Sequence, residues 1–487
     1  MTDTSLFAVI ILMASAVGMV AVLANRLTER VKIPVPLLVL VGAAVAVNTL
    51  PVLPPPSEQT VERVITVALV VVLFDGGMHI GWSRFRAAAV PIVSVGVLGT
   101  FLTAGGAALL LHFVCGLDWY LALLVATAVA PTDPAVVFSV LGKREITGRS
   151  GTILEGESGA NDPVGISLMA GLLKAGGLSA AGFASVGSYF VQQMLIGAAV
   201  GAVGGGALLV FIRRVPLPSE ALYPLRTLAA SLMLYSIAAL AHGSGFLAVF
   251  VAGIIIGDAN APYKPEVQRF HSALAGLVEI IAFAFLGLTV DLPILTHPDV
   301  WVPGVVLAVA LALVVRPLGV GACLLPVRLE HNERAFIVVA GLKGAVPILL
   351  GEFLRAAHIP QAERLYGIVI VVVIFSVLVQ ASSVPLLARL LRLPMRTIAP
   401  EPWAVGVRLR DEPDGAHRLT VGSGSAAEGS TIEDLAESIG DIWVSIVVRS
   451  SGLVPVRSDT ELMVGDDLVI LADPELSDTL ADQFRPA

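Results

Sequence analysis

The sequence is poor in charge, in aromatic side chains and in cysteine. Of its 487 residues, 14% are Asp, Glu, Lys or Arg and 6% are aromatic, whereas 56% are hydrophobic. A soluble globular chain carries about 25% charged residues, so this composition excludes an ordinary soluble protein. With a mean hydropathy of +0.88, the sequence indicates a polytopic membrane protein surrounded by lipid.

Cysteine chemistry and soluble-type enzymology also find no support. The two cysteines, Cys115 and Cys323, lie in apolar segments without a partner at metal-ligand spacing, so we expect small buried side chains and no disulfide. The eight histidines form no metal-binding pattern, and the sequence has no phosphate-binding glycine loop and no catalytic serine signature. We expect neither an enzyme nor a cofactor, and no nucleic-acid partner.

Acidic charge is concentrated at the end of the chain. From Glu401 onward there are 17 Asp and Glu against 6 Lys and Arg, although the net charge of the whole chain is −8. Residues 393–402 contain three prolines and predict a linker. We therefore expect a transmembrane domain at 1–392 and a separate soluble domain at 403–487.

Long apolar segments predict about thirteen transmembrane helices. About 20 apolar residues cross a hydrocarbon core of roughly 30 Å. The segments lie at 5–24, 34–50, 61–79, 91–114, 119–142, 151–173, 186–212, 223–242, 244–257, 272–290, 299–325, 335–354 and 365–391.

The basic residues between these segments predict the orientation, because Lys and Arg accumulate on the cytoplasmic side. The loops that follow odd-numbered segments carry 18 basic residues. The other loops have only Arg63, Lys174, Arg355 and Arg364. This division predicts an N-terminus outside and a C-terminal domain in the cytoplasm. Only Asp3 is charged ahead of the first segment, so cleavage of that segment as a signal peptide is not expected.

The sixth segment contains an unusual cluster of carboxylates, E-G-E-S-G-A-N-D-P at 155–163. In a helix, Ser158 and Asp162 share one face, and Glu157 and Asn161 form the neighbouring row. One charged side chain at the bilayer centre costs roughly 2.5 to 3.5 kcal/mol or more. The cluster therefore predicts an ion or proton site.

The depth of these acids differs along the helix. About eleven residues at 1.5 Å each place Asp162 roughly 16 Å from the cytoplasmic face, near the bilayer midplane. Glu155 lies about 10 Å nearer the cytoplasm, and we expect it to cap the helix or line the entrance.

Two segments contain helix-breaking residues. In the fifth, two prolines flank Thr132 and Asp133 and free backbone carbonyls near the bilayer centre. The twelfth reads G-L-K-G-A-V-P at 341–347, with Lys343 in the break. Such interruptions at corresponding places are typical of inverted-repeat transporters, here with segments four to six and eleven to thirteen as the repeats. We expect two crossed broken helices, with Lys343 offsetting negative helix ends or pairing with a carboxylate.

Other residues of the apolar segments also require a structural explanation. Arg316, in the eleventh segment, is expected to partner an interior carboxylate rather than to reach the interface. Asp75 lies near the cytoplasmic end of the third segment, where we expect it to be interfacial or paired. Gly197, Gly201 and Gly205 are four residues apart and favour close helix packing.

The C-terminal domain is predicted to be a small α/β unit. Its length of about 85 residues allows only a modest core, so a homodimer is expected. The first helix is expected to be capped by Ser430 or Thr431. The expected strands lie near 403–409, 443–449 and 465–472, and the expected helices at 429–436 and from about 475.

Three motifs of the apolar segments resemble those of the monovalent cation:proton antiporter family, in its NhaP branch. The likeness rests on T-D-P at 132–134, E-S-G-A-N-D-P at 157–163 and G-L-K-G-A-V-P at 341–347, and it extends over residues 1–395. The C-terminal domain resembles an RCK C-terminal (TrkA-C) domain through G-S-T-I-E-D-L and V-G-D-D-L-V-I. Together they are similar to the potassium/proton antiporter subgroup. The resemblance implies an all-α membrane domain of about 13 helices with inverted repeats, plus a cytoplasmic α/β domain.

The resemblance also implies roles for single residues. Asp162 is expected to hold the cation and the proton in turn. Asp133, Ser158 and Thr132 are expected to supply further oxygen ligands, and Glu157 to shape the site.

Asn161 is also expected at the ion and proton site, whereas Lys343 and Arg316 are expected to be charge partners within the membrane. Asn161 stands where some relatives have a second aspartate, and an Asn-Asp pair is associated with electroneutral one-for-one exchange. Lys343 replaces the family's more usual arginine and lacks its planar fork. Arg316 matches an interior arginine that pairs with a carboxylate of the sixth segment.

The expected function is exchange of K⁺ for H⁺ across a bacterial inner membrane by alternating access. Na⁺ or Rb⁺ are alternative cargo ions, and a sodium/proton antiporter uses the same core. A ligand-gated cation channel would need a filter loop such as T-V-G-Y-G, which the sequence lacks, and a sensor without flux is a further alternative. The likeness allows a nucleotide-type small-molecule regulator on the RCK-C domain, but without a preceding Rossmann half it does not imply NAD.

Overall fold

The computed structural model describes Met19 and residues 35–50, 55–141, 144–146, 149–259, 261–393, 395–397, 415–440, 442–449, 452–473 and 476–485. The chain divides into two compact units, Met1–Thr397 and Ile398–Ala487, which are described separately.

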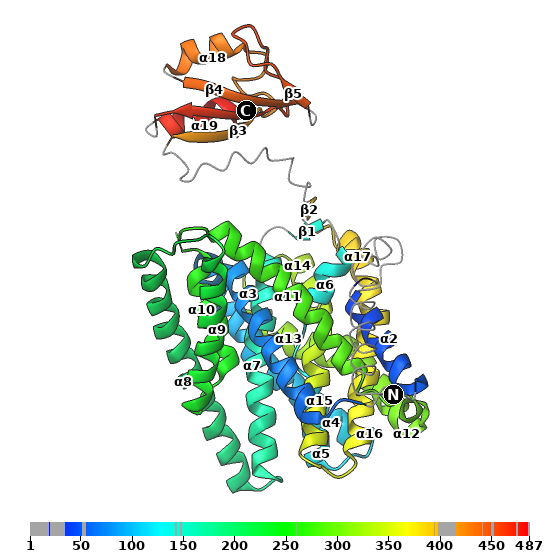
Figure 1. Cartoon of the computed structure of the whole chain (residues 1–487). Coiled ribbons are helices and arrows are strands. Elements are labelled where there is room, and N and C mark those ends of the chain that lie inside the picture. The colour runs from blue at the N-terminus through cyan, green and yellow to red at the C-terminus, as the bar shows by residue number, and fades with distance from the viewer. Residues whose placement is uncertain are drawn as a thin grey trace. The chain divides into compact units, whose positions relative to one another are not determined.

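Unit 1 is almost entirely helical (Figure 1). Three π-helical segments interrupt its helices: η1 (Ser94–Gly99), η3 (Leu311–Val315) and η4 (Ser376–Gln380). A 3₁₀ turn, η2 (Pro293–Thr296), and an antiparallel pair of strands, β1 (Arg144–Ile146) and β2 (Met395–Thr397), complete it. Its α-helices are α2 (Val35–Thr49), α3 (Glu58–Val93), α4 (Thr100–Phe113), α5 (Trp119–Val129), α6 (Pro134–Leu141), α7 (Arg149–Ala175), α8 (Ala180–Arg214), α9 (Leu222–Leu240), α10 (Gly245–Gly257), α11 (Lys264–Gly287), α12 (Pro298–Ala310), α13 (Arg316–Leu324), α14 (His331–Val339), α15 (Ala345–Ala356), α16 (Ala362–Phe375) and α17 (Ala381–Leu390).

The second to the thirteenth predicted segments each coincide with a helix or with consecutive helices of this list. The first predicted segment lies outside the described residues, apart from Met19. Within the described ranges, six helices are long and apolar enough to cross a bilayer, or seven if α5 and α6 are one bent span. Other segments are shorter or divided by breaks, so thirteen spans remain a prediction.

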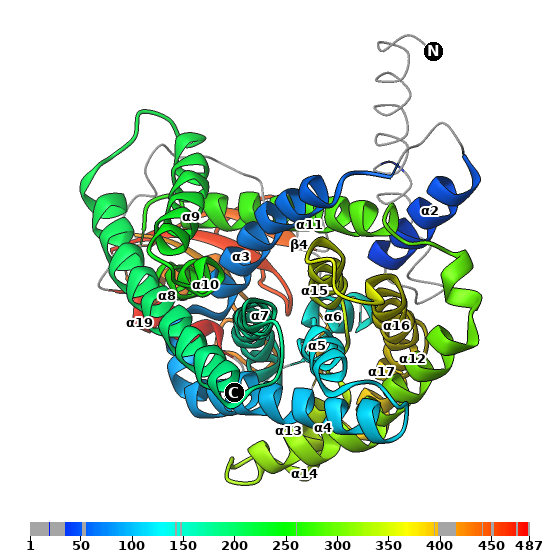
Figure 2. The ribbon, with the colours of Figure 1, turned by 90° about the horizontal axis from the view of Figure 1, so that it is seen from below.

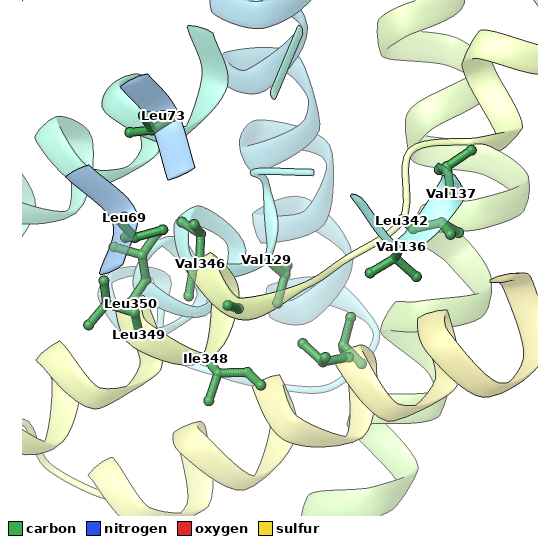
Figure 3. Packing of buried hydrophobic residues seen from close by; sticks show 14 of the residues in the cluster. Leu69, Leu73, Val129, Val136, Val137, Leu342, Val346, Ile348, Leu349 and Leu350 are labelled. Atoms are coloured by element: carbon green, nitrogen blue, oxygen red, sulfur yellow. The ribbon is translucent and has the colours of Figure 1, made fainter. Parts of the chain in front are cut away.

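The two predicted helix breaks are present, and their extended links meet. The axes of α5 and α6 differ by 41° across the first break, and residues 341–344 separate α14 from α15. The backbone N–H of Asp133 donates to the carbonyl of Leu342 at 2.8 Å. Figure 3 shows apolar side chains around this crossing, among them Val129, Val136 and Val346. The π-helical segments lie in the preceding helical stretches of the chain. η1 lies between α3 and α4, ahead of the first broken segment, and η3 lies between α12 and α13, ahead of the second.

The expected loop between the third and fourth segments is wrong, because α3 continues through it. Gly81 has a left-handed φ of +66° and joins two helical parts in one residue. Asp258 fills the space that a side chain at this position would need, and its carboxylate accepts hydrogen bonds from the backbone N–H and hydroxyl of Ser83. Glycine allows the left-handed turn that other residues disfavour, so no loop is needed.

The small-residue stripe of α8 packs as its spacing predicts. Side chains at Gly197, Gly201 and Gly205 would collide with Ser244, Ala248 and Ala252. These contacts bring the backbones of α8 and α10 close together, which is the arrangement that such a stripe favours. In the end-on view of Figure 2, α8 lies along α10 at the edge of the unit, whereas α5, α6, α7 and α15 lie near its centre.

The described residues of unit 2 form a four-stranded antiparallel sheet with two helices. Its strands are in the order β3-β6-β4-β5, and a core including Leu435, Val447, Ile470 and Phe484 lies between sheet and helices. Thr431 caps the first helix by accepting the N–H of Asp434. The elements are β3 (Ala416–Thr420), α18 (Ile432–Ile439), β4 (Ile442–Arg449), β5 (Gly452–Val454), β6 (Asp467–Ala472) and α19 (Ser477–Phe484).

Four of the elements expected in this unit therefore coincide with α18, β4, β6 and α19, whereas the expected strand at 403–409 lies outside the described residues. Strand β3 was not expected. Its sequence A-H-R-L-T has too few apolar residues to signal a strand, and its pairing with β6 stabilises it.

An ion pair between the buried carboxylate of Asp466 and the partly exposed Arg449 stabilises the turn that leads into β6. Burial alone would raise the pKa of Asp466, but hydrogen bonds from Arg449 (2.8 and 2.7 Å) and from the N–H of Met463 (2.9 Å) lower it below its usual value. A carboxylate with a lowered pKa stabilises the fold fully above the pKa of the unfolded chain. This contribution is lost as the pH falls through the folded pKa.

We predict that Asp466→Asn lowers the unfolding free energy of unit 2 by about 2 kcal/mol at neutral pH, the scale of a charged hydrogen bond. In the full chain, amides of β4 and β6 should exchange with deuterium about 30-fold faster. The difference from wild type should shrink in acid. Asp459, which is exposed, provides the control Asp459→Asn, and equal exchange rates in both variants would contradict the prediction.

Candidate ion-binding site

A cavity of about 390 Å³ lies inside unit 1, between α3 and α11 on one wall and α6, α7 and the start of α15 on the other. Among the described residues that line it there is no lysine or arginine. A cavity lined mainly by groups of one sign of charge concentrates ions of the opposite sign, and five of the six chargeable groups here are carboxylates. The lining groups that can carry charge are Asp75, His79, Asp133, Glu155, Asp162 and Glu279.

Helix α7 contributes one face to this cavity, as its sequence predicts. Glu155, Ser158 and Asp162 line the cavity at spacings of three and four residues. Asp162 is only 6% exposed, and its Oδ1 has no hydrogen-bond partner among the described residues. A buried carboxylate oxygen without a partner is costly. Binding a proton or a cation would remove that cost.

Asp133 lies where the two broken helices begin again. Its carboxylate accepts the backbone N–H of Ala135 at 2.9 Å and also that of Ala345. These amides belong to the first turns of α6 and α15, whose N-terminal ends carry partial positive charge. One carboxylate therefore compensates two helix ends, and it also lines the cavity.

Lys343 compensates the opposite kind of helix end. Its Nζ donates to the carbonyls of Ala130 and Pro131 at 2.9 and 3.0 Å, at the C-terminal end of α5. Of the two expected roles, the structure shows the neutralisation of a helix end. No ion pair joins Lys343 to a carboxylate of the described residues.

Arg316 pairs with Glu157, a carboxylate of the predicted sixth segment. The guanidinium contacts both carboxylate oxygens, at 2.7 and 3.0 Å, and the two side chains are 3% and 2% exposed. Arg316 also donates to the carbonyls of Val338 and Ile337 at the end of α14. Arg316 therefore compensates the C-terminal end of α14, as Lys343 compensates the C-terminal end of α5.

Three other predicted ligands form a separate network beside this ion pair. The hydroxyl of Thr132 accepts from Nδ2 of Asn161 at 2.8 Å and donates to Oε1 of Glu157 at 3.3 Å. None of the three lines the cavity. The predicted set thus falls into two groups: Asp133, Ser158 and Asp162 at the cavity, and Thr132, Glu157 and Asn161 behind it.

Two glycines of the twelfth predicted segment leave room for charged side chains. A side chain at Gly341 would collide with the guanidinium of Arg316, and one at Gly344 would collide with the carboxylate of Asp133. Sequence reasoning explained these glycines only as helix breakers. The structure shows that they also leave space for the guanidinium of Arg316 and the carboxylate of Asp133, which compensate the helix ends.

We predict that Gly344→Ala lowers ion flux at least tenfold while the protein remains inserted, because the new methyl group displaces the Asp133 carboxylate from the helix ends. Flux into proteoliposomes and yield of monodisperse protein are the measurements. Gly105→Ala is the control, since no atom lies within 4 Å of a side chain at that position. Equal flux in the two variants would show that the position of the Asp133 carboxylate does not affect ion flux.

Glu279 is the cavity carboxylate that sequence reasoning missed. It belongs to no recognisable motif, but it lies in the tenth predicted segment, 272–290, and a carboxylate in an apolar segment is itself a signal. Asp75 also lines the cavity; it accepts a hydrogen bond from Ser272 at 3.2 Å and lies 3.4 Å from Nδ1 of His79.

The chain is similar to a known protein family over most of unit 1. A family model described as "Sodium/hydrogen exchanger, transmembrane" matches residues 7–390. The chain is similar to the K(+)/H(+) antiporter NhaP of Alkalimonas amylolytica, with 34% identity over 79% of this chain and 67% of the relative. It is also similar to the K(+)/H(+) antiporter NhaP2 of Shewanella oneidensis, with 31% identity over 88% of this chain and 75% of the relative.

A relative with a different cargo ion in its name is also similar. The Na(+)/H(+) antiporter NhaP of Pseudomonas aeruginosa is 29% identical over 68% of this chain and 81% of the relative. Among solved structures, the sodium proton antiporter MjNhaP1 of Methanocaldococcus jannaschii superimposes with a TM-score of 0.66, at 22% identity, over 78% of this chain and 99% of that one. That likeness supports the fold of unit 1.

Proposed function

Because the chain belongs to the sodium/hydrogen exchanger family, we propose that it is a secondary transporter that exchanges K⁺ for H⁺ across a membrane. The observation that carries the proposal is the Asp162 carboxylate, buried in an anionic cavity with one oxygen unpartnered. Its neighbours Asp133 and Ser158 supply further oxygen atoms at the same cavity. Oxygen ligands suit a hard alkali-metal cation.

Competition for Asp162 accounts for the coupling of the two fluxes. The bare carboxylate is costly in this buried position, whereas its protonated and its cation-bound forms are both neutral. If only neutral forms pass between the inward-facing and outward-facing states, one cation moves for each proton. The nearby charges are already compensated: Arg316 by Glu157, and Lys343 by the end of α5. The exchange is therefore proposed to be electroneutral.

Potassium is proposed as the cargo because the Alkalimonas amylolytica and Shewanella oneidensis relatives, which match 79% and 88% of this chain, are named K(+)/H(+) antiporters. Sodium is the second candidate, on the strength of the Pseudomonas aeruginosa relative. Rubidium, similar in size to potassium, serves as a test ion.

We predict that Asp162→Asn abolishes exchange, since the amide can neither bind a proton nor neutralise a cation. In proteoliposomes, the purified wild-type protein should move protons in response to K⁺ and Rb⁺ gradients and more weakly in response to a Na⁺ gradient. The variant should move no protons in response to any of these gradients. Asp299→Asn, at an exposed site outside the cavity, is the control. Proton-coupled flux at the wild-type rate in Asp162→Asn would overturn the assignment, and equal rates for Na⁺ and K⁺ would overturn the preference.

The organisation of the whole protein is proposed from the sequence. Residues 1–392 form the exchanger of a multi-pass bacterial inner-membrane protein, with the N-terminus outside, and residues 393–402 link it to a cytoplasmic RCK-C domain at 403–487. The antiparallel sheet and two helices of unit 2 support a small regulatory domain. A homodimer and a nucleotide-type ligand of this domain are part of the proposal.

We predict that deletion of residues 403–487 leaves exchange active but shifts its dependence on pH or cation concentration. Cavity and site residues all lie in unit 1, so the truncated protein retains them. Flux across a pH series is the measurement, with size-exclusion chromatography to establish that the truncated protein folds. Total loss of flux in a folded truncated protein would show that unit 2 is needed for transport itself.

A further inference from the structure

Helix α11 presents one stripe of residues to the cavity. Its lining positions recur at every turn of the helix, as on one face. Small side chains occupy most of the stripe, and Glu279 is its one carboxylate. The lining residues of α11 are Ser272, Ala275, Gly276, Glu279, Ala282 and Phe283.

Glu279 lies two helical turns beyond Ser272 along α11. Ser272 is hydrogen-bonded to Asp75, and Glu279 follows it by seven residues, or about 10 Å of helix. On the opposite wall, Asp162 follows Glu155 by the same seven residues. The cavity thus has an outer pair of acidic positions, Asp75 and Glu155, and an inner pair, Glu279 and Asp162.

No ion pair or hydrogen bond joins Glu279 to any of the residues described in the structure. Asp133 lines the same cavity, and its charge acts on Glu279 electrostatically. Lys343 and Arg316 are the buried cations of the broken-helix region, and both are engaged by helix-end carbonyls. Glu279 is half-buried and faces the cavity, and the Oδ1 of Asp162 has no hydrogen-bond partner among the described residues. Both carboxylates are therefore available to a cation that enters from the cavity.

We propose that Glu279 is a second cargo-binding carboxylate, which supplies an oxygen ligand to the transported cation from the wall opposite Asp162. The proposal rests on the cation/proton exchange proposed above. The empty pair of Asp162 and Glu279 holds two protons. An entering cation displaces one of them to the cavity water, and the loaded pair holds one cation and one proton. Both forms are neutral, so exchange remains one for one.

Glu279 also affects the pH dependence of exchange. The titratable groups that face it are Asp75 and His79 of α3, Asp133 at the break, and Glu155 and Asp162 of α7. A second carboxylate nearby makes loss of a proton from Asp162 harder. Replacing Glu279 by a neutral side chain should therefore move the acid limb of the activity profile to lower pH.

The test measures exchange by the purified full chain in proteoliposomes as a function of K⁺ concentration and pH. Glu279→Ala should raise the KM for K⁺ about tenfold, with a maximal rate within about threefold of wild type, because it removes a ligand and leaves Asp162. Glu279→Gln keeps an oxygen ligand, so its KM should rise less, but its acid limb should move by about one pH unit. Glu266→Ala, in the first turn of the same helix and outside the cavity, should match wild type.

The outcomes distinguish this proposal from the proposed function. If wild type shows no cation-dependent proton flux, the exchange function itself fails. If wild type exchanges and both Glu279 variants share its KM and pH profile, the role of Glu279 is overturned. If Glu279→Ala is inactive or does not fold, Glu279→Gln decides: activity with the shifted profile supports the proposal, and an inserted but inactive Gln variant overturns it.

Discussion

The site depends on the compensation of helix ends that are buried inside the membrane domain. Two broken helices expose amides and carbonyls there, and each unsatisfied backbone group in a water-free setting costs several kcal/mol. Asp133 accepts from the starts of α6 and α15, while Lys343 and Arg316 donate to the ends of α5 and α14. These three groups are already engaged at helix ends, and Asp162 keeps one oxygen without a hydrogen-bond partner among the described residues, which is the basis of the role proposed for it.

Much of this arrangement could be predicted from the sequence. The prolines beside Thr132 and Asp133 fix the position of the first break, and the three-and-four spacing of α7 separates Ser158 and Asp162 from Glu157 and Asn161. These inferences use only local geometry, in which helix periodicity and the missing donors of proline act over a few residues. They therefore do not depend on how distant helices pack.

What could not be predicted depends on contacts between segments far apart in the sequence. The partners of Lys343 are carbonyls more than 200 residues away, and both a carboxylate and a helix end are reasonable partners for an ammonium. Glu279 has no neighbouring motif, and only the packing of α11 beside α3 brings it to the cavity. Similarly, Gly344 shows no sign in the sequence that Asp133 occupies the space beside it.

The turn within α3 limits how its two parts can move. Gly81 joins them without a loop, and Ser83 is hydrogen-bonded to Asp258 directly beyond it. A joint of one residue provides no spare length of chain, so the two parts cannot slide past each other; they can only swivel about Gly81. Asp75 and His79 lie on the first part, and the second continues into η1, whose Gly96 packs against Ala160 of α7. Any change in the width of the cavity at this edge is therefore an angular one about Gly81.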